Sequence, residues 1–600
     1  MLKIVLFSGG TGSIAIQKGF ASLYGYDNYQ MDVVINAYDN GKSTGACRKV
    51  FGGNILGPSD LRKNQLTQYE LAYGKEIQNQ DSYEAKQLEL FELRFDAKNH
   101  ADYYGKARAL LKDSDFLCGD VKTEFLSLLD YFFFEDPENG KYRDTVRGVD
   151  FHDFSLSNIF YASCAAKNGY SLAEAGRRMS EILRIENRVH LISDVNLYLK
   201  AETESGTRIE DEGDIVTWKN PADRIRRAIL EDPFGNETIP AVDENNTDRV
   251  SEIIRDADLI LFSSGTQWSS LIPTYMHKGF RELIREAKAK KYLVMNNAED
   301  YDMTGLCADE LLETVGRYLD LDGVTILLND NAMESMRHVN GPYRTIHGKL
   351  SWPENREHIP EAVALAIMRD YFPANGNISR LISDLDGTLW DAYGDSHAMA
   401  VGQENLALFQ GTVFSGNSYD HVYSVTSAYF THHDGEKIYC DYGNTFFTLD
   451  NTEGATYNLT GAFALPGDLA AEIETDADFA GKVMVRGGSV ITVKPLTDRE
   501  EKLEKVRSIL KKYGGEYEAS LAGRTSIDIK HKEFDKAASL KLAMSAEGWD
   551  ADSILYIGDE LEKGHETCIL GCGVRVFPVK DVFETNLLLK TLAGKEGDMR

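Results

Sequence analysis

Positive charge, cysteine and long apolar runs are all scarce in this chain. Its 600 residues hold 65 lysines and arginines against 95 aspartates and glutamates, a formal net charge of −30. Such a chain repels the phosphate backbone, so we expect no nucleic-acid partner. An anionic substrate would be held by local donors, such as helix N-termini and metal ions, against the overall field.

The chain also has no apolar window of the roughly 18 residues that a membrane-spanning helix needs, so we expect no membrane partner. The apolar run Met1–Phe7 lacks the long core and cleavage site of a signal peptide, and it ends in Ser8-Gly9-Gly10, which reads as strand then loop. The seven cysteines are scattered and odd in number, as expected of reduced thiols. These features predict a cytoplasmic protein, and the sequence leaves its oligomeric state open.

Strand-like apolar runs alternate with helical segments in both halves of the chain. Examples are Asp32–Asn36, Leu259–Phe262, Tyr292–Asn296, Val324–Leu328 and Ile554–Gly558. The alternation predicts an α/β fold, with two Rossmann-like, doubly wound parallel-sheet domains.

The Pro/Gly/Asn stretch at 373–377 follows an expected helix, Ile359–Tyr371, and precedes a new strand. We therefore expect domains at 1–372 and 377–600. Residues from about 65 to 150 are polar, charged and helical in period, which predicts a solvent-facing helical insertion in the first domain.

The hexapeptide Asp384-Leu385-Asp386-Gly387-Thr388-Leu389 follows an apolar strand in the second domain. Residues i and i+2 of an extended segment point the same way, so two carboxylates meet at the carboxyl end of the strand. One can attack phosphorus while the other protonates the leaving oxygen, and Mg²⁺ would hold the nucleophile and the phosphate together. A strand followed by an acidic turn is the alternative interpretation.

Three later segments favour the catalytic interpretation. Ser415 ends a second strand, Lys536 stands at a helix start, and Asp559 ends another apolar strand with Glu566 beyond it. In this order the segments resemble the four motifs of the haloacid dehalogenase superfamily, from Asn377 to about Lys590. Roughly 120 residues separate Ser415 from Lys536, which leaves room for an α/β cap at about 425–530. Caps in that position occur in the subclass of phosphomannomutase, sucrose-phosphate phosphatase and the Cof-type phosphatases.

The resemblance implies a phosphatase that forms an aspartyl-phosphate and acts on a small, sugar-like phosphomonoester; a phosphomutase is the alternative. The nucleophile, general acid/base, phosphate contact and charge clamp would be Asp384, Asp386, Ser415 and Lys536. The implied Mg²⁺ ligands are Asp384, Asp386 and Asp559. Glu566 is expected as an outer ligand only, because this chain has Gly564-His565-Glu566 where the family often has Gly-Asn-Asp.

Near the N-terminus, Gly9-Gly10-Thr11-Gly12 lies between a strand and an amphipathic helix. Glycine lets backbone N–H groups approach a phosphate, and a helix N-terminus favours negative charge. The segment is neither the dinucleotide fingerprint nor a P-loop, and alone it also fits a structural turn.

Further polar, small-residue loops accompany it, at Asn36–Gly45, Leu56–Asn64, Ser155–Phe160 and Leu261–Pro273. Over residues 1 to about 372, outside the insertion, this series resembles the family shared by 2-phospho-L-lactate transferase and the bacterial gluconeogenesis factors. It is closer to the second branch. The resemblance implies binding of a nucleotide diphosphate or nucleotide sugar of the GDP or UDP type. The expected contacts are Gly9, Gly10, Thr11, Gly12, Asn36, Asp39, Asn158, Ser264, Gly265 and Thr266.

One departure bears on the chemistry. The family pairs two aspartates where this chain has Asp39-Asn40, so one metal-binding charge of the transferase is missing. Two hypotheses stay open: an enzyme that transfers a phosphoryl-linked group, and a non-catalytic nucleotide-sugar sensor that regulates the phosphatase. For Asn36 and Asn158, a loop amide satisfied within the protein is an equal alternative.

Overall fold

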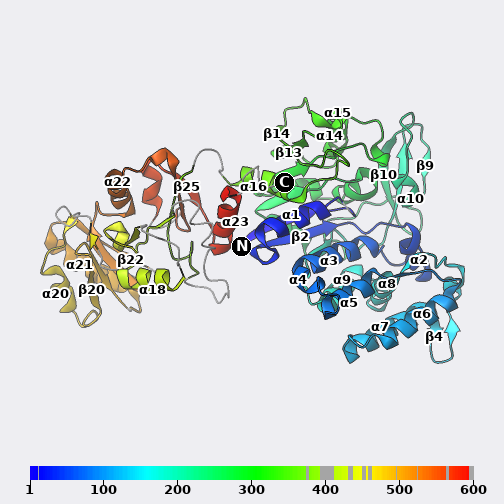
Figure 1. The fold of residues 1–600 in the computed structure, drawn as a ribbon, viewed down its shortest axis with the longest axis horizontal. Coiled ribbons are helices and arrows are strands. Elements are labelled where there is room, and N and C mark those ends of the chain that lie inside the picture. The colour runs from blue at the N-terminus through cyan, green and yellow to red at the C-terminus, as the bar shows by residue number, and fades with distance from the viewer. Residues whose placement is uncertain are drawn as a thin grey trace. The chain divides into compact units, whose positions relative to one another are not determined.

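A computed structural model of the chain divides into two compact units (Figure 1). The first takes in residues 2–371, and the second begins at Phe372. The described residues are 1–10, 12–372, 378–391, 411–429, 437–448, 455–456, 463–494, 496–522, 525–561 and 566–593. Thr11, His565 and the linker expected at 373–377 lie outside them.

A seven-stranded parallel sheet forms the centre of the first unit, with strand order β14-β13-β12-β11-β1-β2-β7. The strand bounds in that order are Arg344–Gly348, Val324–Asn329, Lys290–Val294, Leu259–Phe262, Leu2–Phe7, Tyr29–Ile35 and Val189–Leu191. β11 reads Leu-Ile-Leu-Phe and is buried throughout. A continuous apolar run of this kind is typical of a parallel strand covered on both faces.

Helices follow the strands along the chain, as in other parallel α/β sheets. α1 (Ile14–Tyr24) follows β1 and packs closely on α16 (Pro360–Tyr371). Gly19 permits this packing, because a Cβ there would lie 2.0 Å from the Pro360 carbonyl oxygen. Other helices of this unit are α2 (Lys42–Val50), α3 (Ser59–Ala72), α8 (Leu156–Lys167), α9 (Leu172–Leu183), α11 (Val250–Arg255), α13 (Phe280–Glu286) and α14 (Ala308–Gly316).

The first unit has two further groups of elements besides the parallel sheet. The first is helical, with α5 (Tyr83–Glu92), α6 (His100–Asp113) and α7 (Gly119–Phe133). Besides solvent-facing sides it has an aromatic core, in which the Phe125 ring stacks on Phe160 with centroids 4.3 Å apart. The second is an antiparallel sheet of order β10-β8-β9 with a short helix before β10. Its elements are β8 (Tyr198–Thr203), β9 (Arg208–Ile209), α10 (Glu212–Val216) and β10 (Ile225–Glu231).

The second unit has a smaller parallel sheet of order β16-β15-β24-β25, formed by Thr412–Val413, Arg380–Ser383, Ile554–Gly558 and Arg575–Pro578. A separate antiparallel sheet has the order β20-β21-β23-β22, formed by Val483–Arg486, Val490–Val493, Ser526–His531 and Tyr517–Ala522. α20 (Leu469–Glu474) and α21 (Arg499–Leu510) share an apolar core with this second sheet.

The segment expected as a cap, about residues 425–530, contains this antiparallel sheet. It also contains β17 (Ile438–Cys440), whose Tyr439 packs with Phe414 in the core of the parallel sheet. The expected fold class, α/β with parallel sheets in both halves, is confirmed. None of the described helices is long and apolar enough to cross a membrane.

Candidate functional sites

Two parallel strands of the second unit deliver carboxylates to one edge of their sheet. β15 and β24 are paired neighbours, and Asp384 and Asp559 follow their carboxyl ends. Gly387, three residues after Asp384, has a φ of +80°, and a Cβ there would lie 2.3 Å from Asp559 Oδ2. Only glycine lets the chain turn past Asp559 at this point.

A buried lysine joins the two sides of the site. Lys536 begins α22 (Lys536–Glu547), and the Asp535 side chain caps that helix by accepting from the Ala538 N–H at 2.8 Å. The Lys536 Nζ lies 3.0 Å from Asp384 Oδ1 and 2.7 Å from Glu566 Oε1. The sequence predicted a charge clamp at this position, and the structure places it against the predicted nucleophile.

Glu566, expected as an outer ligand, is buried, at 1% exposure. Its Oε1 accepts hydrogen bonds from Lys536 and, at 2.5 Å, from the Tyr556 hydroxyl. Its Oε2 is buried and has no hydrogen-bond partner among the described residues.

The donor set fits a divalent cation. Carboxylate oxygens of Asp384, Asp559 and Glu566 lie within 4.8 Å of one another, and no other such group occurs among the described residues. Burial, with the charges of Glu566 and Asp559, raises the pKa of Asp384 well above its ordinary value despite Lys536. Burial and Glu566 raise the pKa of Asp559 to about 6. Crowded oxygen donors of one charge are the ligands that Mg²⁺ prefers.

Asp386 makes different contacts from the other carboxylates. Its Oδ2 accepts from Asn417 Nδ2 at 2.5 Å, and its Oδ1 lies 2.9 Å from His421 Nε2. The hydrogen bond to Asp386 raises the pKa of His421. Asp386 is absent from the three-carboxylate group, so its role as a Mg²⁺ ligand stays a prediction. His421, in α18 (Tyr419–Tyr429), was missed because it lies outside the motif that ends the strand.

The predicted residues meet at one small cavity of about 120 Å³. Its lining includes all six: Asp384, Asp386, Ser415, Lys536, Asp559 and Glu566. Ser415 is buried, and its Oγ accepts from the Asn417 N–H at 3.0 Å. Asp528 of β23 contributes a wall from the antiparallel sheet. The cavity therefore joins the carboxylate cluster to the part of the unit expected as a cap.

In the first unit, the two small-residue loops face a common cavity of about 540 Å³. Seven predicted contacts line it: Gly9, Gly10, Gly12, Asp39, Ser264, Gly265 and Thr266. Its size is within the range of roughly 300–1,000 Å³ usual for small-molecule sites. Gly265 has a φ of +143°, which only glycine adopts readily, and its N–H donates to Asn296 Oδ1 at 3.2 Å.

The glycines of the first loop serve different purposes. A Cβ at Gly12 would lie 1.9 Å from the Ser264 carbonyl oxygen, and one at Gly9 would lie 2.6 Å from the Ser270 Cβ. At Gly10 the nearest atoms are Asp60 Oδ1 at 3.4 Å and Lys63 Nζ at 3.5 Å. Gly9 and Gly12 are required by packing, whereas a Cβ at Gly10 would make only ordinary contacts beside the cavity.

Asn36 and Asn158 are not among the residues that line this cavity. Asn36 Nδ2 donates to the Ser270 carbonyl and to Thr274 Oγ1, and Asn158 Nδ2 donates to the hydroxyls of two serines. The Asn36 amide therefore fits the alternative interpretation, whereas Asn158 lies in α8 and its Oδ1 is buried without a hydrogen-bond partner among the described residues.

Four carboxylates stand on the walls of the cavity, those of Asp39, Asp60, Glu212 and Asp300, and the sequence indicated only Asp39 as a contact. Asp60 and Glu212 join Asp39 there, with Lys63 beside Asp60. Burial and the nearby Asp39 raise the pKa of Glu212 to about 9, and burial raises that of Asp60 to about 6. Asp60 lies in the first turn of α3, within the segment Leu56–Asn64 already noted from the sequence, but no local pattern points to Glu212 in α10.

Known proteins are similar to parts of this chain. A family model described as "2-phospho-L-lactate transferase CofD" matches residues 4–345. A putative gluconeogenesis factor of Thermotoga maritima is 26% identical over 329 residues, which is 55% of this chain and 79% of that protein. A Bacillus halodurans crystal structure, of a member of the UPF0052 family, has 18% identity and a TM-score of 0.41, covering 61% of this chain and 100% of its own. The Synechocystis sucrose-phosphatase has 15% identity and a TM-score of 0.25, covering 34% and 83%. Since the family model spans more than half of the sequence, the chain belongs to the CofD family.

Proposed function

We propose that the protein handles phosphate compounds at two sites, and that the second unit is a Mg²⁺-dependent phosphatase of a small, sugar-like phosphomonoester. The observation that carries the proposal is the contact of the buried Lys536 with Asp384, beside the carboxylates of Asp559 and Glu566. A lysine held against a strand-end carboxylate in a cavity suits a nucleophile that must approach a phosphate.

In this mechanism an Asp384 oxygen attacks phosphorus, and the substrate oxygen leaves with a proton from Asp386. Water then attacks phosphorus, Asp386 takes a proton from that water, and inorganic phosphate leaves as the Asp384 carboxylate is restored. Lys536 offsets negative charge on the phosphoryl oxygens, and Ser415 contacts one of them. Asp384, Asp559 and Glu566 would hold Mg²⁺, which when bound offsets the repulsion between nucleophile and phosphate. Asn417 and His421 position the Asp386 carboxylate.

Hydrolysis of p-nitrophenyl phosphate by the full chain tests this proposal. We expect Asp384→Asn and an excess of EDTA each to remove activity, because one lacks the nucleophile and the other the cation. Asp420→Asn, at an exposed position close to the site, is the matched control and should stay active. Full activity in Asp384→Asn would refute the mechanism. A requirement for a sugar bisphosphate activator would instead indicate the phosphomutase.

For the first unit we propose binding of a nucleotide diphosphate or nucleotide-linked phosphometabolite at the 540 Å³ cavity. Its support is the pair of loops at Gly9, Gly10 and Gly12 and at Ser264–Thr266, which pack on each other at Gly12 and Ser264 and together line the cavity. Calorimetry with GDP, UDP and UDP-sugars tests binding, and chromatography of the same mixtures tests turnover. Consumption of the ligand would favour group transfer, whereas binding without consumption would favour the sensor. No binding of any nucleotide at millimolar concentration would contradict the proposal.

A further inference from the structure

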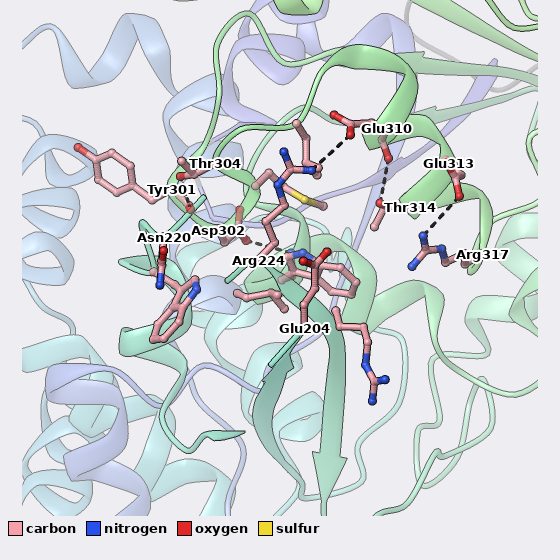
Figure 2. A pocket seen from close by; sticks show the side chains of 16 residues that line it. Glu204, Asn220, Arg224, Tyr301, Asp302, Thr304, Glu310, Glu313, Thr314 and Arg317 are labelled. Atoms are coloured by element: carbon pink, nitrogen blue, oxygen red, sulfur yellow. Dashed lines mark hydrogen bonds and ion pairs between the residues drawn. The ribbon is translucent and has the colours of Figure 1, made fainter. Parts of the chain in front are cut away.

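The first unit has another cavity, of about 180 Å³, that the proposed function does not use (Figure 2). Its walls come from the β8–β10 sheet, from the turns that follow β11 and β12, and from α14. The same two turns also border the larger cavity, but through other residues. Thr266 and Asp300 line the larger cavity, while Trp268 and Asp302 line this one.

Asp302 is the most unusual group in this wall. It is 3% exposed, and its Oδ2 accepts from the backbone N–H groups of Trp268 at 2.9 Å and Ser269 at 3.2 Å. Its Oδ1 is buried without a hydrogen-bond partner among the described residues. A buried acceptor left unpaired costs about 1–3 kcal/mol, more when charged. Burial, with the charge of Asp300, raises the pKa of this carboxyl to about 7.

The other charges of the wall are mostly paired. Arg224 contacts Glu310 at 3.3 Å, Arg317 contacts Glu313 at 3.5 Å, and Arg226 contacts Glu202. Figure 2 draws the first two pairs as dashed lines above and beside the cavity. No ion pair forms at Glu204 among the described residues, so its carboxylate supplies negative charge that no arginine offsets, and Asp302 adds to that charge when it is ionised.

The remaining lining limits the kind of ligand. No group of three metal-binding side chains occurs here in the described part of the chain, which disfavours an inorganic divalent cation. Trp218 and Trp268 offer indole rings, the aromatic surface that binds cations best. The ring of Tyr301 at the rim already has the Lys219 Nζ 4.8 Å from its centroid. The volume of about 180 Å³ is below the roughly 300–1,000 Å³ usual for small-molecule sites, too little for a nucleotide.

We propose that this cavity is a second ligand site, which takes a small organic cation such as a primary ammonium or amidinium on a ring or short chain. The cation donates to the free oxygen of Asp302, Glu204 closes over it from the rim, and the indole rings cover its apolar part. The site is separate from the proposed nucleotide cavity and does not depend on nucleotide binding.

Calorimetry on the full chain tests the proposal, with benzylamine as the probe and benzyl alcohol as its uncharged counterpart. We expect benzylamine to bind with millimolar affinity or better and benzyl alcohol at least tenfold more weakly. Asp302→Asn keeps an acceptor for the Trp268 N–H but removes the charge. This variant should weaken the binding of benzylamine at least tenfold. Glu237→Gln, which changes a carboxylate paired with Arg227 outside the lining of the cavity, is the matched control and should bind like wild type.

A second variant protects the test against misfolding. Glu204→Gln alters an exposed side chain, and it should weaken the binding of benzylamine severalfold. This measurement remains possible even if Asp302→Asn fails to fold. No benzylamine binding to wild type at 10 mM, equal affinity for both probes, or wild-type affinity in Glu204→Gln would each overturn the proposal. UDP and GDP titrations of the same samples report on the other cavity, so failure at one site is distinguishable from failure at the other.

Discussion

Each unit buries a base between two carboxylates, yet the surroundings of the two bases differ. In the second unit Lys536 lies between Asp384 and Glu566. In the first unit His190 of β7 lies between Asp32 of β2, at 2.9 Å, and Asp248, at 3.2 Å. Each base is at most 5% exposed.

The difference lies in the oxygens that remain. Around His190 the remaining carboxylate oxygens accept hydrogen bonds: Asp32 Oδ2 accepts from Gln30, and Asp248 Oδ1 accepts from Arg177. Around Lys536, Glu566 Oε2 is unpaired, Asp559 is within ligand distance, and the group opens on a cavity. A base between two acids therefore indicates a reactive site only where unsatisfied oxygens and space for a substrate accompany it. His190 instead joins neighbouring strands.

Replacing Lys536 by methionine should have the largest effect. Loss of a charge clamp of this kind costs about 10²–10³-fold in rate. Removal of one partner from a buried ion pair costs about 3–5 kcal/mol in stability. We expect p-nitrophenyl phosphate hydrolysis and the unfolding midpoint of the second unit both to fall. Lys541→Met, an exposed position on the same helix, should change neither. A stable and active Lys536→Met protein would contradict the role of Lys536 as a buried charge clamp.

Titration of His190 should change the stability of the first unit with pH, without an effect on activity. Burial by itself would lower its pKa, but the hydrogen bonds to Asp248 and Asp32 and their charges outweigh burial and raise it to about 9. A raised pKa contributes stability that is complete below the unfolded value of about 6.5 and is lost as pH rises through about 9. The free energy of unfolding of the first unit should therefore fall by up to about 3 kcal/mol between pH 6 and 10.

His190→Gln is the control for this titration, because glutamine can still donate a hydrogen bond but does not titrate. Denaturant unfolding at several pH values should show a flatter profile for the variant. Identical slopes in the two proteins would mean that other groups titrate, and that the His190 cluster adds little.

Gly10 and Gly12 separate ligand binding from packing within one loop. Gly10→Val fits the protein but places a branched side chain where a phosphate would approach, so nucleotide affinity should fall at least tenfold, about 1.4 kcal/mol. Gly12→Ala should instead destabilise the first unit, because its Cβ would meet the Ser264 carbonyl. Calorimetry and thermal unfolding distinguish the two results. Unchanged nucleotide affinity in Gly10→Val would indicate that the phosphates do not bind at this loop.

Glu212 should have a smaller effect on the same binding. Its pKa of about 9 leaves it neutral at pH 7, so raising the pH to 10 adds a negative charge to the cavity. Without a divalent cation, GDP or UDP should then bind a few-fold more weakly at pH 10, and Glu212→Gln should abolish this decrease. Glu210→Gln, an exposed neighbour, should retain it. The same decrease in Glu212→Gln would assign the pH dependence to another group.

The sequence predicted those parts of both sites that depend on local pattern. Asp384 and Asp559 follow apolar strands, and parallel pairing necessarily brings such positions to one edge. Glu212 could not be predicted, because it reaches the cavity only through a helix attached to the β8–β10 sheet, far along the chain from Asp39. Asp302 likewise shows its unpaired oxygen only once the turn after β12 packs on Trp268. For Asn36 the sequence showed the loop position but not the hydrogen-bond partners, so it left a ligand contact and a satisfied amide as equal alternatives.

Cutting the chain between the units should have the smallest effect. Each unit contains its own parallel sheet, and the second has its own apolar clusters, so residues 1–372 and 377–600 should each fold alone. A specific protease site introduced at 373–377 allows the same sample to be measured before and after cleavage. Nucleotide affinity, p-nitrophenyl phosphate hydrolysis and both unfolding midpoints should stay unchanged. A regulatory sensor predicts otherwise: cleavage would abolish any effect of nucleotide on the phosphatase rate while leaving the basal rate intact. Nucleotide dependence that is present before cleavage and absent after it would therefore favour the sensor over two independent activities.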